Sequence, residues 1–449
     1  MAVLALRMAV LISRIKRIDW PFDRLTMNLS KRRLFAVGIL LMIMVGAGFL
    51  LNNLSLNLAY ANSDARAASV DKSIVAANTI FAIRLLKELQ SEQSGRNIFT
   101  SPLSVSIALA MTYNGANSST REAMGSVLGL DGMSDDAVNA GYQQLIESLL
   151  SVDNDVSLNI GDSVWIRSTF APAVNAEFTD TLSRYFRSSV YSRAFDASTI
   201  DEVNSWVSGE TNGKISKVLD SIDSANVMFL INAIYFKGGW VDEFDATLTQ
   251  QADFTTADGS TVKVDMMRRD GGYSYFGDDV VQVARLPYGR DKIAMYLFLP
   301  AEGRSLESFV SGLTSDGLDT YISKLSNTEL ELQLPKLKLE YGKVDLKDAL
   351  TALGMGVAFD SESADFGRIA DVRPERLYIA FVDHKAVIEV NEKGTEAAAV
   401  TDVGISLTSI PVRTPFIVNR PYVFVIRDDR SGTILFSGLI TDPTIQTSP

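Results

Sequence analysis

Few side chains in this chain could do acid–base or nucleophilic chemistry. It has 449 residues, no Cys and a single His, His384. The lack of Cys excludes disulfides and thiolate metal sites, and one His cannot build a zinc site from several His. His384 is therefore the only candidate base for a Ser–His pair. It lies in an apolar stretch, YIAFVDHKAVIEV, which favours a core histidine hydrogen-bonded to its neighbours.

Other patterns typical of enzymes are weak. GETNGK at Gly209–Lys214 approaches a phosphate-binding loop, but too few residues separate its glycines, and Ile215 stands where Ser or Thr would bind magnesium. A helix that ends at Gly213 explains the pattern better. No G-x-S-x-G motif is present. We therefore expect no enzyme, cofactor or metal site, and a serine hydrolase that uses His384 stays as a minor alternative.

The N-terminal part of the chain has the features of an export signal. Lys31, Arg32 and Arg33 precede an apolar run over residues 34–51, and Ala59-Tyr60-Ala61 follows. This order is typical of a signal peptide with a cleavage site. It predicts that residues 1–61 are removed and that residues 62–449 are secreted or periplasmic. The apolar run is also long enough for a membrane anchor, so an anchored protein remains the alternative.

The charge of the exported part is strongly acidic. Residues 1–61 hold 8 of the 42 basic and 2 of the 54 acidic residues, so their removal leaves a net charge near −18. Such a chain is a poor partner for nucleic acid. From Glu122 to Ile166 there is no Lys or Arg. We therefore expect no polyanion cofactor on the helix predicted near residues 136–150.

The rest of the chain is predicted to form one domain, residues 62–449, because no linker or repeat interrupts it. A helical stripe contains Ala77, Ile80 and Phe81. Ser101-Pro102 begins a second helix that is apolar nearly all round and should be buried. VMFLINAIYFKGGW is predicted to be an internal strand. Helices lie mainly in the first half and strands in the second, which indicates an α+β fold.

One segment near the C-terminus fits two structures. In GTEAAAVTDVGISLTSIP, from Gly394 to Pro411, one period-two face has no charge and the other holds both acids. That pattern is typical of a half-buried strand, yet the uncharged face begins with small residues that would hold a strand weakly. Gly394 can act as a flexible hinge. The segment is either an ordinary edge strand with a loop, or a loop that can become a strand inside a sheet.

Several motifs resemble the serpins, the serine protease inhibitor family, across about Val70 to Pro443. The segment VIEVNEKGTEAAAVT resembles the serpin hinge. The other motifs are NIFTSPLSVSIALAMTYNGA, NSWVSGETNGKI, LINAIYFKGGW and FIVNRPYVFVIRDDRSGTILFSGLITDP. Tyr422 stands where the last motif usually has Phe. The resemblance implies one domain of three β-sheets with about nine α-helices and an exposed reactive-centre loop at about residues 394–415.

The resemblance also implies a mechanism. A target serine protease attacks the reactive loop and forms an acyl-enzyme, and the cleaved loop then inserts as a strand in the central sheet. The protease is trapped, so the inhibitor acts once and as a monomer. Small inward residues favour insertion at the hinge. The hinge residues implied are Gly394, Thr395, Glu396, Ala397, Ala398 and Ala399.

Two further groups of residues are implied by matching motifs. Ser101, Ser104, Asn232 and His384 correspond to the cluster called the shutter, which lies beneath the central sheet. Trp240 corresponds to the breach, where the loop enters the sheet. On this interpretation His384 has a structural hydrogen-bonding role in a functional place.

The scissile bond is predicted between Thr408 and Ser409 by the family's usual distance from Gly394. The alternatives are bonds after Leu407 or Ile410, because the far side of the loop varies in length. Thr408 favours elastase-like or subtilisin-like targets, whereas Leu407 would favour chymotrypsin-like ones. The alternative function from the same family is a non-inhibitory serpin that acts as a carrier or chaperone.

Overall fold

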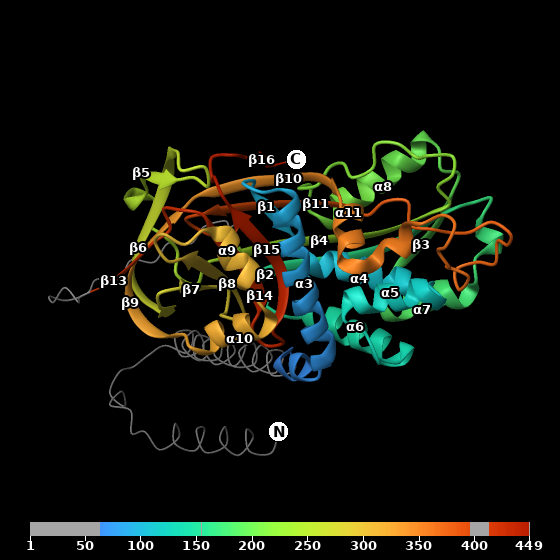
Figure 1. Ribbon diagram of the computed structural model, residues 1–449, viewed down its shortest axis with the longest axis horizontal. Coiled ribbons are helices and arrows are strands. Elements are labelled where there is room, and N and C mark those ends of the chain that lie inside the picture. Colours follow the sequence, from blue (N-terminus) through green and yellow to red (C-terminus); the bar gives the residue numbers. More distant parts are fainter. Residues whose placement is uncertain (1–62, 154, 396–412, 449) are drawn as a thin grey trace, which may run out of the picture. The chain divides into compact units, whose positions relative to one another are not determined.

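The computed structural model describes residues 63–153, 155–395 and 413–448 (Figure 1). Within these residues the strands form two hydrogen-bonded sheets. Most helices lie before residue 211 and most strands after residue 227, so the predicted α+β class is confirmed. The calls on Glu396, Ala397, Ala398, Ala399, Thr408 and Ser409, and on the export signal, lie outside the described residues.

The smaller sheet has seven strands in the order β16-β10-β11-β12-β4-β2-β3. Strands β2 and β4 pair along nearly their whole length, from Val156 opposite Gly238 to Ile166 opposite Met228. The prediction that VMFLINAIYFKGGW is an internal strand is confirmed, because β4 has a neighbour on each side. The bounds are β16 (Thr447–Ser448), β10 (Leu337–Asp345), β11 (Asp383–Asn391), β12 (Gly394–Thr395), β4 (Met228–Gly239), β2 (Val156–Arg167) and β3 (Ser189–Arg193).

The larger sheet has nine strands, eight of them in the order β1-β15-β14-β8-β7-β6-β9-β13, with β5 paired to β6. The 17-residue β6 pairs with β5 and β9 along one part and with β7 along another, so two of the three implied sheets are continuous here. The bounds are β1 (Ile98–Thr100), β15 (Thr433–Ile440), β14 (Tyr422–Asp428), β8 (Ile293–Pro300), β7 (Val281–Tyr288), β6 (Thr261–Gly277), β9 (Ser326–Pro335), β13 (Thr414–Ile417) and β5 (Gln250–Thr255).

Helix α4 (Pro102–Tyr113) contacts both sheets, through β4 of one and β15 of the other. Its start is the one predicted: the Ser101 hydroxyl accepts a hydrogen bond from the Ser104 N–H at 3.2 Å, and Pro102 occupies the first turn. Only Ala108 and Thr112 are partly exposed, so the helix is buried nearly all round, as its composition predicts.

Helix α3 (Lys72–Glu92) corrects one detail of the predicted stripe. Ala77 and Phe81 are buried, but Ile80 is 42% exposed. Asn78 is buried instead of Ile80, and its side-chain amide donates a hydrogen bond to the Ile74 carbonyl at 2.9 Å. A hydrogen-bonded Asn can occupy a core position that a simple apolar count assigns to its neighbour.

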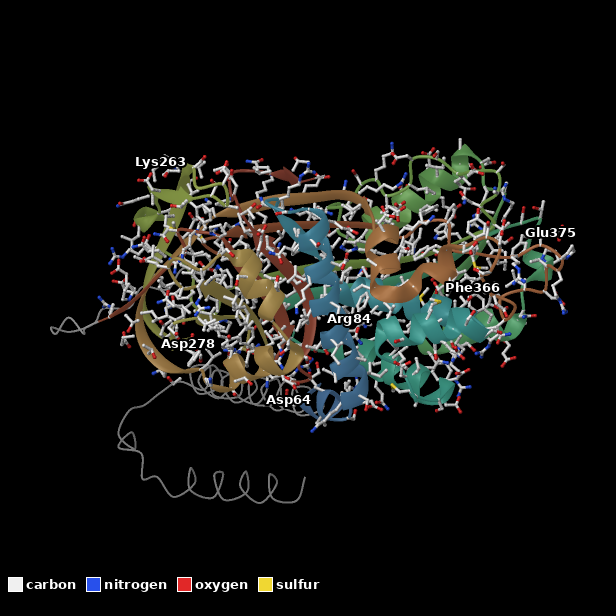
Figure 2. All side chains as sticks on the ribbon, in the orientation of Figure 1. Asp64, Arg84, Lys263, Asp278, Phe366 and Glu375 are labelled. Carbon is white, nitrogen blue, oxygen red and sulfur yellow. The ribbon has the colours of Figure 1, made fainter. Side chains whose placement is uncertain are left out.

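The remaining helices surround the two sheets (Figure 1). Their bounds are α5 (Ser118–Leu128), α6 (Asp135–Leu149), α7 (Ala176–Tyr185), α8 (Ala197–Glu210), α9 (Leu306–Gly312), α10 (Ser315–Ser323) and α11 (Lys347–Leu350). Helix α8 packs on β2 and β4 and ends at Glu210, shortly before Gly213, which has φ +78°. Arg84 of α3, labelled in Figure 2, donates hydrogen bonds to the Ser126 carbonyl at 3.3 Å and to the Leu353 carbonyl at 3.0 Å.

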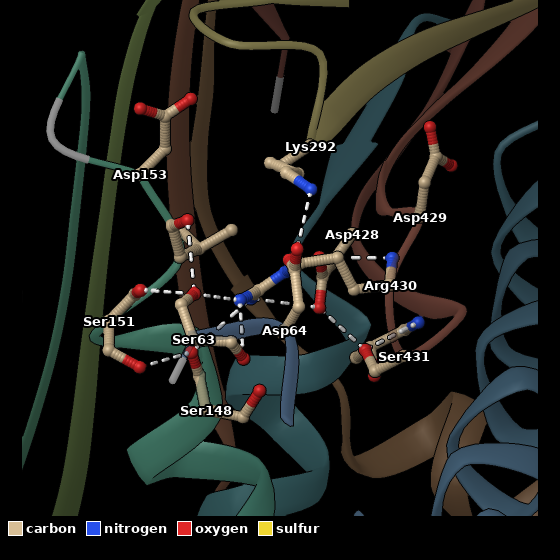
Figure 3. Close-up of polar contacts among 12 residues, drawn as sticks. Ser63, Asp64, Ser148, Ser151, Asp153, Lys292, Asp428, Asp429, Arg430 and Ser431 are labelled. Atoms are coloured by element: carbon tan, nitrogen blue, oxygen red, sulfur yellow. Dashed lines mark hydrogen bonds and ion pairs between the residues drawn. The ribbon is translucent and has the colours of Figure 1, made fainter. Parts of the chain in front are cut away.

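Ser63, the first residue that the structure describes, is hydrogen-bonded to the folded body (Figure 3). The buried Ser63 hydroxyl donates to the Ser151 carbonyl at 2.7 Å, and the Arg430 guanidinium donates to the Ser63 carbonyl at 3.2 Å. Arg430 also pairs with Asp428 at 2.9 Å, and both side chains are buried. In the described part of the chain, no helix is long and apolar enough to cross a membrane.

Candidate functional site: the hinge and the strand slot

Strand β12 lies between β11 and β4 at one end of the seven-stranded sheet. Gly394 pairs with Asn391 on one side and Gly239 on the other, and Thr395 pairs with Val390 and Gly238. Among the described strands, β11 and β4 form no ladder with each other. Within residues 63–395 and 413–448, each of them therefore has one edge beyond β12 that no other strand pairs with. We call the space between these two edges the strand slot.

A cavity of about 470 Å³ lies at the end of the strand slot away from β12. Its walls come from both edges, residues 226–234 before and along β4 and residues 375–385 before and along β11, and from helix α4. A smaller cavity nearer the hinge is lined by Ile234, Phe236, Val387 and Thr395. Since no described strand pairs with these two edges beyond β12, a single additional strand could form hydrogen bonds with both of them.

Gly394 is required by the local backbone. Its φ is +141°, a value that side-chain-bearing residues rarely adopt, and a Cβ there would lie 2.2 Å from the Gly238 carbonyl oxygen. The close approach of these two glycine backbones allows β12 to enter the sheet. The sequence predicts Gly394 as a flexible hinge, and the geometry adds a steric reason for glycine.

Trp240 holds the turn that leads into β12. Its indole N–H donates to the Asn391 carbonyl at 3.0 Å, and its backbone N–H donates to the Lys393 carbonyl at 2.9 Å. The backbone N–H of Phe244 donates to the Glu392 carbonyl at 2.8 Å. The residue predicted for the breach therefore contacts the residues directly before the hinge.

Glu392 is a hinge contact that sequence reasoning missed. Its carboxylate lies 3.1 Å from the Lys336 ammonium and accepts a hydrogen bond from the Thr249 hydroxyl at 2.8 Å. Burial would raise the pKa of Glu392, but hydrogen bonds from its own backbone, Thr249 and Lys336 outweigh burial and lower it. Lys336 lies between β9 and β10, 56 residues before Glu392, so no local sequence pattern links the two residues.

Thr395 points into the protein, as the period-two pattern predicts for its face. It is 4% exposed, and its hydroxyl lies 2.7 Å from the hydroxyl of Tyr288 on β7. Tyr288 is fully buried and belongs to the other sheet. The sequence did not indicate Tyr288.

Three of the four predicted shutter residues lie together. His384 Nε2 accepts a hydrogen bond from the backbone N–H of Ser101 at 3.1 Å, and the Ser101 hydroxyl caps α4 at Ser104. Burial lowers the pKa of His384 to about 4, so its ring is neutral at pH 7. The Ser101 hydroxyl donates to the Leu435 carbonyl at 2.8 Å, so this contact has a structural geometry and not that of a Ser–His nucleophile.

Asn232, the fourth, lies across the cavity and is bound to a residue not predicted. Its amide donates to the Asp162 carboxyl at 2.8 Å, while its Oδ1 atom is buried without a hydrogen-bond partner. Ser104, Asn232 and His384 all line the 470 Å³ cavity. Burial raises the pKa of Asp162 to about 7. The hydrogen bond from Asn232 acts in the opposite direction, and the nearby charge of Glu210 raises this pKa further.

Comparison with known proteins identifies the family. Residues 76–443 match the family model described as serpin (serine protease inhibitor). The chain is 33% identical over 392 residues to Serpin-ZXA of Oryza sativa subsp. japonica, which covers 83% of this chain and 98% of that protein. This chain belongs to the serpin family, most of whose members are protease inhibitors and not enzymes.

Solved structures give the same fold. The native state of the thermophilic serpin tengpin matches with a TM-score of 0.76 and 31% identity, over 83% of this chain and 95% of that one. Human thyroxine-binding globulin, solved in complex with its hormone, matches with a TM-score of 0.73 and 28% identity, over 82% and 98%. The family therefore includes proteins named for inhibition and proteins named for ligand binding.

Proposed function

We propose that this chain is a single-turnover inhibitor of serine proteases that acts by inserting its cleaved reactive loop into the strand slot. The observation that carries the proposal is the position of β12 between β11 and β4, which share no other pairing. An inserted strand would continue β12 and satisfy both edges. Each new backbone hydrogen bond contributes about 0.5–1.5 kcal/mol net, so a dozen would make insertion a one-way step.

The protease would attack the loop between Thr408 and Ser409, with bonds after Leu407 or Ile410 as alternatives. Thr408 before the bond favours elastase-like or subtilisin-like enzymes, since no basic residue precedes it. The hinge supports this function because Thr395 is small, uncharged and inward. Ala397 and Ala399, which the period-two pattern of the sequence assigns to the same face, are small as well. We further propose that the protein is secreted or periplasmic, or anchored through residues 34–51, and acts as a monomer.

The test is incubation with elastase-like, subtilisin-like and chymotrypsin-like proteases, followed by SDS gel electrophoresis and mass spectrometry of the cleaved loop. A complex that survives SDS, with a cut between Leu407 and Pro411, is the expected result. Free turnover of the loop by every protease would instead support a carrier or chaperone, the function that similarity to thyroxine-binding globulin keeps open.

A substitution at the hinge tests insertion directly. We expect Thr395→Arg to convert the inhibitor into a substrate, because a buried guanidinium at the entry to the slot carries a large desolvation cost. Thr395→Ser keeps size and hydroxyl and should retain the complex. SDS-stable complex yield measures both variants, and undiminished yield for Thr395→Arg would refute insertion through this slot.

A further inference from the structure

We infer that Tyr288 is a positioning residue for loop insertion: its hydroxyl holds Thr395 at the entry of the strand slot and so fixes where the inserting strand starts. This inference rests on the proposed inhibitory function. Tyr288 belongs to the nine-stranded sheet, whereas the loop would insert into the seven-stranded sheet.

The geometry of the contact is that of a good buried hydrogen bond. The two hydroxyl oxygens are 2.7 Å apart, Tyr288 is 0% exposed and Thr395 is 4% exposed. Burial raises the pKa of the Tyr288 phenol, and Thr395 is the one hydrogen-bond partner that modifies this shift. If Thr395 left the strand slot, the buried Tyr288 hydroxyl would lose this hydrogen-bond partner. Folded proteins avoid buried hydroxyl groups without partners.

The Tyr288 ring is held in place on three sides. Trp240 stacks on it with ring centroids 4.4 Å apart and planes inclined by 15°, and Phe236 meets it edge-on at 5.1 Å. A Cβ at Gly238 would lie 3.0 Å from the ring, so the third side is backbone. The phenol therefore has little freedom to follow Thr395 if the hinge moves.

The backbone near Tyr288 is tied to the end of β4 as well. The N–H of Val241 donates to the Pro287 carbonyl and the N–H of Gly289 donates to the Gly239 carbonyl, both at 2.9 Å. The end of β7 and the end of β4 are thus one fixed unit, to which Thr395 is attached by a side chain. Such a fixed hydroxyl selects one register for β12, because a shift by one residue would turn the Thr395 side chain away from Tyr288.

Two variants remove the contact from either side. Tyr288→Phe deletes the phenol oxygen, and Thr395→Val replaces the Thr hydroxyl with a methyl group at similar volume. For each we expect the stoichiometry of inhibition, the moles of inhibitor consumed per mole of protease trapped, to rise roughly 2- to 10-fold, the factor that one buried hydrogen bond gives. The first cleavage of the loop should keep its rate. The double variant should rise no further than either single one.

Tyr341→Phe is the matched control. Tyr341 is also 0% exposed and its hydroxyl donates to Gln93 at 2.9 Å, but it lies on β10, away from the hinge. The variant loses one partly buried hydrogen bond, so its melting temperature should fall, while the stoichiometry of inhibition stays at the wild-type value. Thr395→Ser keeps the hydroxyl and should also behave as wild type.

A second readout separates this inference from the proposed function. Hydrogen–deuterium exchange of the peptide that contains Gly394 and Thr395 should speed up several-fold in Tyr288→Phe and not in Tyr341→Phe, whether or not any protease is trapped. Unchanged exchange overturns the contact as a restraint on the hinge. Faster exchange with unchanged stoichiometry overturns its part in insertion. A wild-type protein that traps no protease refutes the inhibitory function and leaves the exchange result standing.

Discussion

Asp162 and His384 are two buried titratable residues whose pKa values are shifted in opposite directions. Burial raises the pKa of Asp162 to about 7 and lowers that of His384 to about 4. Between about pH 4 and 7, Asp162 is therefore protonated in the folded protein and ionised in the unfolded chain. Between about pH 4 and 6.5, His384 is neutral in the folded protein and protonated in the unfolded chain.

These two effects oppose each other. The contribution of Asp162 to stability is fully present below about pH 4 and is lost as the pH rises toward 7. The contribution of His384 has the reverse sign, because it is present above about pH 6.5 and is lost as the pH falls toward 4. Each amounts to about 1.4 kcal/mol per pH unit within its window, so the wild-type protein should show a nearly flat profile from these two groups.

Asp162→Asn should reveal the hidden dependence. Without the carboxyl, the effect of His384 is no longer cancelled by that of Asp162, so the melting temperature at a fixed scan rate should rise from pH 4 to pH 6.5. At pH 8 the variant should exceed the wild type by about 2–4 °C, because no buried carboxylate remains beside Asn232.

The control for this variant is Asp279→Asn, since the Asp279 side chain is 93% exposed. Its profile should match the wild type. If the melting temperatures of Asp162→Asn and wild type differed by the same amount at pH 4 and at pH 8, Asp162 would not be protonated in the native state.

At the scale of single residues, sequence reasoning identified positions that a motif marks and missed those that only the fold brings near. Ser101, Ser104 and His384 lie in recognisable motifs, and the structure places them together. Asp162 lies between Gly161 and Ser163, on the same period-two face as Ile160 and Val164, and no motif marks it. The residue opposite it, Asn232, depends on the register of β2 against β4, which no local pattern specifies.

Among elements, the turn between β14 and β15 is joined to the segment around Ser63 by Arg430, which also forms a buried ion pair within the turn. Arg430 pairs with Asp428 at 2.9 Å, with exposed fractions of 6% and 0%, and also donates to the carbonyls of Ser63 and Ser148. The guanidinium satisfies several acceptors at once, which is the condition for a stable buried charge.

Removal of one partner of this pair should be costly. Arg430→Met leaves Asp428 buried without its cation, and we expect a loss of about 3–5 kcal/mol in the free energy of unfolding. Addition of Asp428→Asn to that variant should restore part of the loss. Urea unfolding monitored by circular dichroism measures both.

Arg373→Met is the matched control, because Arg373 also pairs with an Asp two residues before it, Asp371, but on the surface, with side chains 84% and 62% exposed. Its unfolding midpoint should stay near that of the wild type. Equal losses in Arg373→Met and Arg430→Met would show that burial of the pair is not the cause.

Elements with a strong local signature were predictable. The cap at Ser101 and the uniform burial of α4 follow from Ser-Pro and an apolar run, and β4 follows from twelve residues rich in apolar side chains. The contact of Tyr288 with Thr395 was not predictable, because the two residues are 107 positions apart and belong to different sheets. The exposed Ile80 shows the same limit within one helix, where a hydrogen-bonded Asn78 takes the inward position.

For the whole molecule, the unpaired edges of β4 and β11 imply a large difference in stability between intact and cleaved protein. Cleavage of the loop by any protease that is not trapped should allow insertion and raise the melting temperature by more than about 10 °C, because a dozen added hydrogen bonds are worth on the order of 10 kcal/mol. Differential scanning calorimetry before and after cleavage measures this rise. Cleaved Thr395→Arg should show little of it, and an equal rise there would mean that another segment fills the slot.

The contact of Ser63 with Arg430 has a consequence for the order in which the protein is made. A ribosome that adds about 5–20 residues per second needs on the order of 20 seconds or more to reach residue 430. Until then Ser63 has no guanidinium to bind, and β1 lacks its partner β15. The folded body therefore cannot be completed until the last strands and the Arg430 turn have been synthesised.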